Sequence, residues 1–212
     1  MQSQRLGKLV VGVLSGVLIS ALTGAVAGAM PTADDGVVLG LKVRLGGRYD
    51  DVRMCVASGP GVPGGMAADV SFFLELGLTE DWSAHIDVPV MRPLLFGAAF
   101  EMLQFEPSVS IRRRVRTAGV ADVVLGPTLG LSLHHGPDYE SERSGAGRGA
   151  SFFALGPSLG GHVGLDFRRP GESFNFQLGI SPQVTPLFSI ADPDEHRGWV
   201  IGGLLDGSFR WQ

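Results

Sequence analysis

Residues 151–190 decide the fold, and they read SFFALGPSLGGHVGLDFRRPGESFNFQLGISPQVTPLFSI. Within 153–167 every second residue is apolar, apart from one glycine, whereas the residues between them are small or polar. A period of two is typical of a β-strand whose two faces meet different surroundings. The alternation resumes over 174–186, after a turn at 168–173 that contains Pro and Gly. The stretch therefore predicts a long β-hairpin, apolar on one face and small and polar on the other.

The composition is unusual for a soluble protein. The 212 residues include 32 glycines, only 18% charged residues, and just two lysines, Lys8 and Lys42. Lysine is a common residue on water-exposed surfaces, so its scarcity indicates that little of this surface faces water. The single cysteine, Cys55, excludes an internal disulfide framework and a cysteine-based zinc site. The net charge of −4 gives no indication of nucleic-acid binding.

Residues 1–29 are predicted to be a cleavable secretory signal peptide. They combine a positively charged start, an apolar core and small-x-small cleavage sites that end at Ala27 and Ala29. The alternative is an uncleaved helical anchor. The remaining residues, 30–212, are predicted to form one β-barrel domain.

Alternation like that of the hairpin recurs along the rest of the chain and gives eight strands in all. The predicted strands are 37–46, 69–78, 82–90, 102–112, 122–134, 152–167, 174–186 and 199–211. The links between them alternate between long and short, and the short ones are 79–81, 113–119 and 168–173. An even number of strands brings both ends of the domain to the side of the short links.

A proline pattern recurs once in each of four successive strands. The pattern is apolar, any residue, Pro, polar, apolar, and it occupies 105–109, 125–129, 155–159 and 180–184. Proline inside a paired strand removes one hydrogen bond of the ladder. We therefore expect bulges or local unpairing at some of these prolines.

The apolar face is predicted to point outward, into lipid. The other face is rich in glycine and serine, which suits the crowded interior of an eight-stranded barrel better than a water-exposed surface. The strands reach or exceed the 9–11 residues that a tilted strand needs to cross a bilayer, and an open sheet would leave unpaired backbone groups in lipid. The prediction is an all-β fold, a closed antiparallel eight-stranded transmembrane β-barrel with up-and-down meander topology. The alternative is a secreted soluble barrel that binds a hydrophobic ligand inside.

Aromatic residues gather near the strand ends, as expected for girdles at the two membrane interfaces. The predicted girdle residues are Trp82, Phe167, Phe174, Trp199, Phe209 and Trp211.

By pattern, residues 36–212 resemble small bacterial outer-membrane β-barrel proteins, the class that includes the OmpA membrane domain, OmpX and OmpW. The resemblance implies an outer-membrane location, surrounding outer-membrane lipid, short links in the periplasm and long links outside the cell. It also implies that the assembly machinery reads an aromatic residue at the end of the last strand. Here the chain continues one residue beyond that aromatic, since it ends Phe209-Arg-Trp211-Gln212.

Ionisable residues on the small, polar face are predicted to line the lumen. A buried charge must be paired or it is very costly, so the first interpretation is a network of salt bridges that fills the lumen. The alternative is a narrow channel for small solutes, which would lean towards cations because acids outnumber bases. The predicted lumen residues are Lys42, Arg44, Asp69, Glu75, His85, Asp87, Glu106, Arg112, Asp122, His162, Asp166, Asp206 and Arg210.

Catalysis is not predicted. Ser83, His85 and Asp87 are the residue types of a hydrolase triad. On one face of a strand, however, such residues lie about 6.5–7 Å apart, too far for a direct relay unless side chains reach across.

A metal or cofactor is not predicted either. A surface metal site at His134, His135 and His196 is an alternative to the simpler interpretation of solvated loop residues. The sequence thus predicts an integral outer-membrane protein with a structural, surface-interaction or small-solute role. The long links at 47–67 and 135–149 are candidate sites for an external partner.

Overall fold

The structure is a computed structural model. It describes residues 36–50, 64–94, 103–137, 151–167, 174–189 and 198–211. Among these residues, no helix has both the length and the apolar character needed to cross a membrane. The predicted signal peptide, 1–29, lies outside them.

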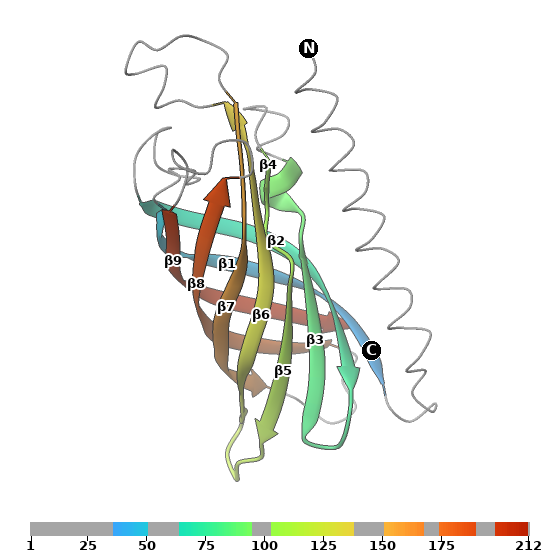
Figure 1. Cartoon of the computed structure of the whole chain (residues 1–212). Coiled ribbons are helices and arrows are strands. Elements are labelled where there is room, and N and C mark those ends of the chain that lie inside the picture. The colour runs from blue at the N-terminus through green and yellow to red at the C-terminus, as the bar shows by residue number, and fades with distance from the viewer. Residues whose placement is uncertain are drawn as a thin grey trace. The chain divides into compact units, whose positions relative to one another are not determined.

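The described residues form long β-strands, coloured in chain order in Figure 1. The strands are β1 (Val37–Asp50), β2 (Gly65–Gly77), β3 (Trp82–Pro89), β4 (Leu103–Phe105), β5 (Ser108–Val115), β6 (Asp122–Pro137), β7 (Ser151–Phe167), β8 (Phe174–Ser189) and β9 (Gly198–Trp211).

The sheet closes on itself. All pairings are antiparallel. β1 pairs with β2 and β9, β3 pairs with β2 and β5, and β8 pairs with β7 and β9, while β6 pairs with β4, β5 and β7 (Figure 1). Strands β4 and β5 are two parts of one barrel strand, because both pair with β6 in the same register. Phe105 lies opposite Leu133, and three residues further on Ser108 lies opposite Gly130. The predicted closed, antiparallel eight-stranded meander barrel is therefore confirmed.

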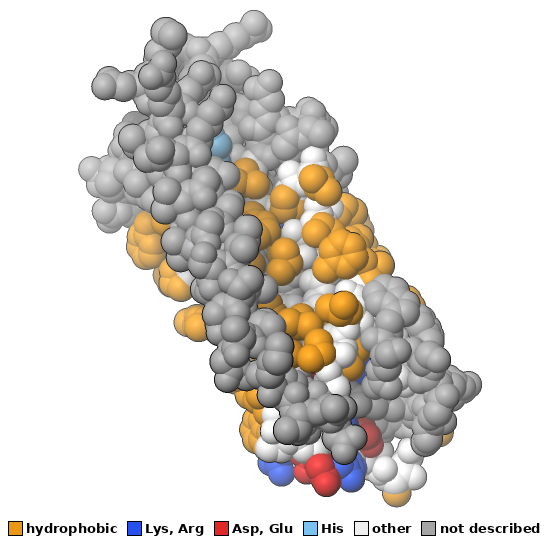
Figure 2. Space-filling view, turned by 90° about the vertical axis from the view of Figure 1, so that its right-hand side faces the viewer, with side chains coloured by type: hydrophobic (Ala, Val, Ile, Leu, Met, Phe, Trp, Pro, Cys, Tyr) orange, Lys and Arg blue, Asp and Glu red, His pale blue; other side chains and the backbone are white. Residues whose placement is uncertain are grey.

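The two faces of the wall have opposite chemistry. On β7, Leu159 keeps 52% of its surface exposed on the outer face, whereas His162 on the inner face keeps 1%. Figure 2 shows hydrophobic side chains over the middle of the visible outer surface and charged side chains at its lower edge. The buried polar groups that line the interior contradict the apolar ligand cavity of the soluble-barrel alternative.

The strands extend further than the sequence analysis predicted. Strand β1 continues to Asp50 and β2 begins at Gly65, so the predicted link 47–67 is partly strand. The predicted connection after Val90 contains a helical turn at 91–94. The predicted strands end where the apolar alternation fades. A strand that extends beyond the apolar band, however, does not need apolar residues on its outer face.

The strand prolines interrupt the ladder without shifting its register. Every gap in the described ladders contains at least one proline, and the two strands advance by equal numbers of residues across each gap. The predicted local unpairing is confirmed, and no bulge occurs at these gaps. The prolines in the gaps are Pro107, Pro127, Pro157, Pro182 and Pro186.

The gaps concentrate at two of the strand interfaces. Pro107 and Pro127 interrupt β5·β6, whereas the other three prolines interrupt β7·β8. The β6·β7 and β8·β9 ladders run without a break, since each proline turns its nitrogen, which has no hydrogen to donate, away from them. At Pro107 the carbonyl still accepts a hydrogen bond from the Leu131 N–H, at 3.1 Å. The wall thus loses individual hydrogen bonds at two interfaces and keeps its closure.

Amide hydrogen exchange should reveal these two interfaces. We expect amides of residues 156–162 that point towards β8 to exchange faster than amides of the same strand that point towards β6, because only the β7·β8 ladder is interrupted there. NMR of the protein in detergent micelles measures both sets in one sample. Equal protection on the two sides of β7 would contradict the register described above.

Candidate functional site

The lumen is the candidate site, because it gathers nearly all the buried charge of the described residues. Alternation sends every second side chain of each strand inward, and glycine on the inner face leaves room for the larger ones. A Cβ at Gly179 would overlap the His162 ring, and one at Gly40 would overlap the Phe73 ring. Loss of the glycine at either position would therefore push a lumen side chain out of place.

Lys42 and Asp87 form a pair in the middle of the lumen. The Nζ atom of Lys42 lies 2.6 Å from Asp87 Oδ1, and both side chains are almost fully buried. His85 Nε2 lies 3.4 Å from the same oxygen, and the imidazole stacks on Phe73 with ring centroids 4.4 Å apart. This cluster joins β1, β2 and β3 across the interior.

Glu106 is the centre of a second cluster, nearer the long links. Arg48 Nη2 lies 3.0 Å from Glu106 Oε1, and Arg92 Nη2 lies 2.9 Å from Oε2. The Ser132 hydroxyl donates to Oε1 at 2.9 Å, and His134 Nε2 lies 3.2 Å from the same atom. The carboxylate of Glu106, between β4 and β5, thus connects β1, β6 and the helical turn at 91–94.

Asp69 extends this cluster to β2. Both Nε and Nη2 of Arg92 lie 3.0 Å from Asp69 Oδ2, so Arg92 bridges Asp69 and Glu106.

Arg210 organises a third cluster near the short links. Its Nη1 donates to both carboxylate oxygens of Asp166 at 3.1 Å, and its Nε lies 3.2 Å from Glu75. Its Nη2 donates to the Gln177 side-chain oxygen at 2.5 Å. Arg114 adds a second guanidinium, with Nε 3.5 Å from Asp166. Cationic and anionic groups from β2, β5, β7 and β9 meet here.

His162 and Asp206 occupy the wall of β7 and β9 between these clusters. Ser181 donates to Asp206 Oδ2 at 2.6 Å, and its oxygen lies 3.1 Å from His162 Nδ1. The Gln177 amide nitrogen lies 2.7 Å from His162 Nε2. Ser181 therefore donates to the carboxylate, and His162 does not take its proton, which is not the arrangement of an activated nucleophile.

The structure also places the other candidate chemical groups. Both ring nitrogens of His85 lack a hydrogen-bond partner within the described residues, so no relay joins Ser83, His85 and Asp87. His134 points into the lumen, whereas His135 lies on the outer face near the Phe153 ring, at 6.0 Å between centroids.

These two histidines therefore cannot share one ion, and His196 lies outside the described residues. The described chain holds no group of three or more His, Cys, Asp or Glu residues placed to bind a metal.

Asp122 differs from the rest of the predicted set. It is only partly buried at the short-link end, where its carboxylate accepts from the Thr117 N–H at 3.0 Å. It belongs to the mouth of the barrel and not to its centre.

Three lumen arginines were missed by the sequence analysis, which placed Arg48, Arg92 and Arg114 in links. Arg48 and Arg114 continue the inward alternation of β1 and β5, so extending the strands by two to four residues would have found them. Arg92 reaches the lumen from a helical turn, which no alternation predicts. With these three, seven cationic side chains face six of the predicted carboxylates inside the lumen, and the seventh, Asp122, lies at its mouth. The excess of acids on which a cation preference was predicted is therefore absent.

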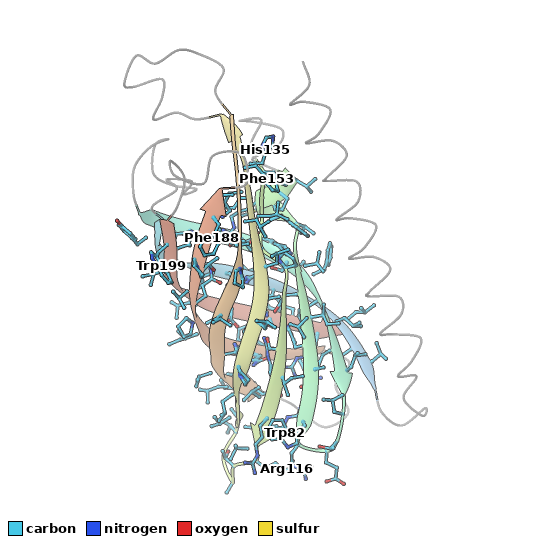
Figure 3. The ribbon with its side chains drawn as sticks, in the orientation of Figure 1. Trp82, Arg116, His135, Phe153, Phe188 and Trp199 are labelled. Atoms are coloured by element: carbon cyan, nitrogen blue, oxygen red, sulfur yellow. The ribbon has the colours of Figure 1, made fainter. Side chains whose placement is uncertain are left out.

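Tryptophan side chains lie at opposite ends of the wall. Trp82 is near the short links and Trp199 near the long links, where Phe188 also lies on the outer surface (Figure 3). The Arg113 guanidinium lies over the Trp82 ring, 5.8 Å from its centroid. The charged group thus sits at the end of the apolar band, beside an aromatic ring.

Phenylalanines form a row across β7, β8 and β9 near the short links. Ring centroids lie 6.2 Å apart for Phe167 and Phe176, and 5.2 Å apart for Phe176 and Phe209. The side chains of Phe174 and Trp211 lie outside the described ones.

Comparison with known proteins finds similarity to a solved structure. No protein-family model matches the chain, and no curated protein matches its sequence. Among solved structures, the chain is similar to the crystal structure of Neisserial surface protein A, with a TM-score of 0.52 and 11% sequence identity. The alignment covers 84% of this chain and 99% of the other. At this identity the match concerns the fold, and the chain therefore shares the barrel fold of that surface protein.

Proposed function

We propose that this protein is an integral outer-membrane β-barrel whose lumen is closed by paired charges, and that it acts as a structural or surface-interaction protein without catalysis. The observation that carries the proposal is the inside-out arrangement of the wall. Apolar side chains such as Leu129, Leu159 and Leu205 are exposed outside, while charged side chains are buried inside. A closed ladder with an apolar exterior meets the demands that lipid places on a protein backbone.

The charge clusters support a closed lumen. Glu106, Asp87 and Asp166 each hold cationic groups that come from other strands, at distances of 2.6–3.5 Å. An eight-stranded barrel has an interior only wide enough for its own side chains. Solutes would have to break these pairs to pass.

A narrow channel is the second candidate, because a small cavity lies in the middle of the lumen. Carboxylates do not outnumber cationic side chains in the lumen, which removes the earlier reason for a cation preference. Lipid of the outer membrane and the outer-membrane assembly machinery are the proposed partners. The segments 47–67 and 135–149, which lie largely outside the described residues, remain the proposed contacts for any external ligand.

Fractionation and conductance test this proposal. The protein expressed with its first 29 residues should be recovered in outer membranes and should change gel mobility on boiling, as a closed barrel unfolds. In planar lipid bilayers the purified protein should add no conductance above that of lipid alone. Recovery as a soluble periplasmic protein would end the membrane proposal, and regular single-channel steps would replace closure with the channel.

A further inference from the structure

Arg112 is the least satisfied cation of the lumen interior. Only 3% of its side chain is exposed, yet its Nε and Nη1 atoms have no hydrogen-bond partner among the described residues. The carboxylate oxygen Asp87 Oδ2 lies 3.8 Å from its Nη2, which is beyond hydrogen-bond distance. The carboxylate of Asp87 is already engaged by Lys42 at 2.6 Å. Arg112 is therefore a buried cation that no carboxylate of the described residues approaches within hydrogen-bond distance.

Arg44 is in a similar position. Its Nη2 donates to the Ser71 hydroxyl at 2.5 Å, and Asp69 lies 4.0 Å away. Within the described part of the chain, its Nε has no hydrogen-bond partner. By contrast, Arg92 and Arg210 each have a carboxylate oxygen at 2.9–3.1 Å.

Both guanidinium groups border the cavity in the middle of the lumen. Lys42, Asp87 and Glu106 also line it, together with hydroxyl-bearing residues that include Ser110 and Ser158. The space open to water-sized molecules is about 20 Å³, which is room for one small ion or a water or two.

The two carboxylates at the cavity are committed to other partners. Asp87 pairs with Lys42, and Glu106 receives Arg48, Arg92 and Ser132. The remaining charged side chains of the cavity lining, Arg44 and Arg112, are both cationic. A guanidinium offers only N–H donors and remains protonated in proteins, so the missing partner must accept hydrogen bonds. A water accepts hydrogen bonds but leaves the buried charge uncompensated, which is costly.

We propose that this cavity binds a single small monovalent inorganic anion of the halide class, held by Arg112 and Arg44. The anion accepts from the unpartnered guanidinium N–H groups and completes the charge balance in the middle of the lumen. This site goes beyond the proposed closure and surface role, and it would exist whether or not the lumen conducts.

Bromide is the probe for the first test, because its anomalous scattering identifies it in a crystal. The full barrel crystallised in sodium bromide should show one anomalous peak inside the lumen, within hydrogen-bonding range of Arg112. Peaks confined to the outer surface, or an empty lumen, would overturn the proposal. This measurement requires no variant to fold.

Stability in solution gives the second test. We expect sodium bromide to stabilise the folded protein in micelles more than sodium gluconate at equal ionic strength. At a bromide concentration ten times the dissociation constant, the folded-to-unfolded ratio should rise about 11-fold. Arg112→Gln should abolish the difference between the two salts, while Arg112→Lys, which keeps the charge, should retain part of it.

The matched control is Arg48→Gln, which also removes a buried lumen arginine but one outside the lining of the cavity. It should keep the bromide effect of the parent protein. The same salt dependence in the Arg112→Gln and Arg48→Gln variants, or no bromide effect in the parent protein, would contradict the assignment. If Arg112→Gln does not fold, the comparison of Arg112→Lys with the parent protein and the bromide map decide the question.

Discussion

Replacing Leu159 by arginine is expected to lower the free energy of unfolding in a lipid bilayer by about 2–4 kcal/mol. Leu159 lies in the middle of β7, opposite Leu129 of β6, and both are exposed on the outer face. A charged side chain on the lipid face costs most at the middle of the bilayer. Urea unfolding of the protein in vesicles, followed by tryptophan fluorescence, measures the change.

Leu78→Arg is the matched control for this variant. Leu78 has the same side chain and nearly the same exposure, 53%, but it lies in the turn after β2. Near the membrane interface the same substitution should cost only about 0–1 kcal/mol. Equal costs at the two leucines would show that no lipid gradient acts along the wall.

Replacing Glu106 by alanine is expected to reduce stability by about 3–5 kcal/mol, because it leaves a buried cationic cluster without its carboxylate. Arg48 and Arg92 both lose a partner at 2.9–3.0 Å. Ser132 and His134 lose an acceptor as well. The midpoint of urea unfolding in vesicles should fall accordingly.

The control for Glu106 is a carboxylate on the surface. Glu80 is 87% exposed and pairs with Arg116 at 3.2 Å. Because water screens that pair, Glu80→Ala should change stability by only about 0–1 kcal/mol. A similarly small effect of Glu106→Ala would mean that the lumen is wet and the clusters do not hold the barrel together.

Local alternation was sufficient to predict the wall. In β7 each residue meets either the lumen or the outside, so the period of two in the sequence is the period of the fold. The same rule placed Lys42, His85, Asp166 and Arg210, which are all buried inside. Closure followed because an open sheet cannot leave its edges in lipid.

Which of these side chains contact one another could not be predicted from the sequence. Arg210 meets Asp166 across 44 positions of the chain, and Lys42 meets Asp87 across 45. Such contacts depend on the register between strands, and alternation fixes only which face a residue occupies. The contact between Arg92 and Glu106 could not be predicted either, because alternation does not apply to an arginine in a helical turn.

The prolines show a second limit. Pro157 and Pro182 conflict with a central strand when each is considered alone. In the closed sheet the missing N–H groups of both prolines fall on the β7·β8 interface, opposite small or proline residues of the neighbouring strand. The other edge of each strand stays fully paired. Only the pairing of whole strands explains how the pattern is accommodated.

A spin-label scan along β7 in lipid vesicles tests the central claim most directly. Cys55 is first replaced by serine, and single cysteines are then introduced at consecutive positions from Leu155 to Leu165. Collision with oxygen, which concentrates in lipid, should alternate with a period of two, high at Leu159 and Val163 and low at Ser158 and His162. The opposite phase, or a uniform rate along the strand, would contradict a barrel with lipid outside and paired charges within.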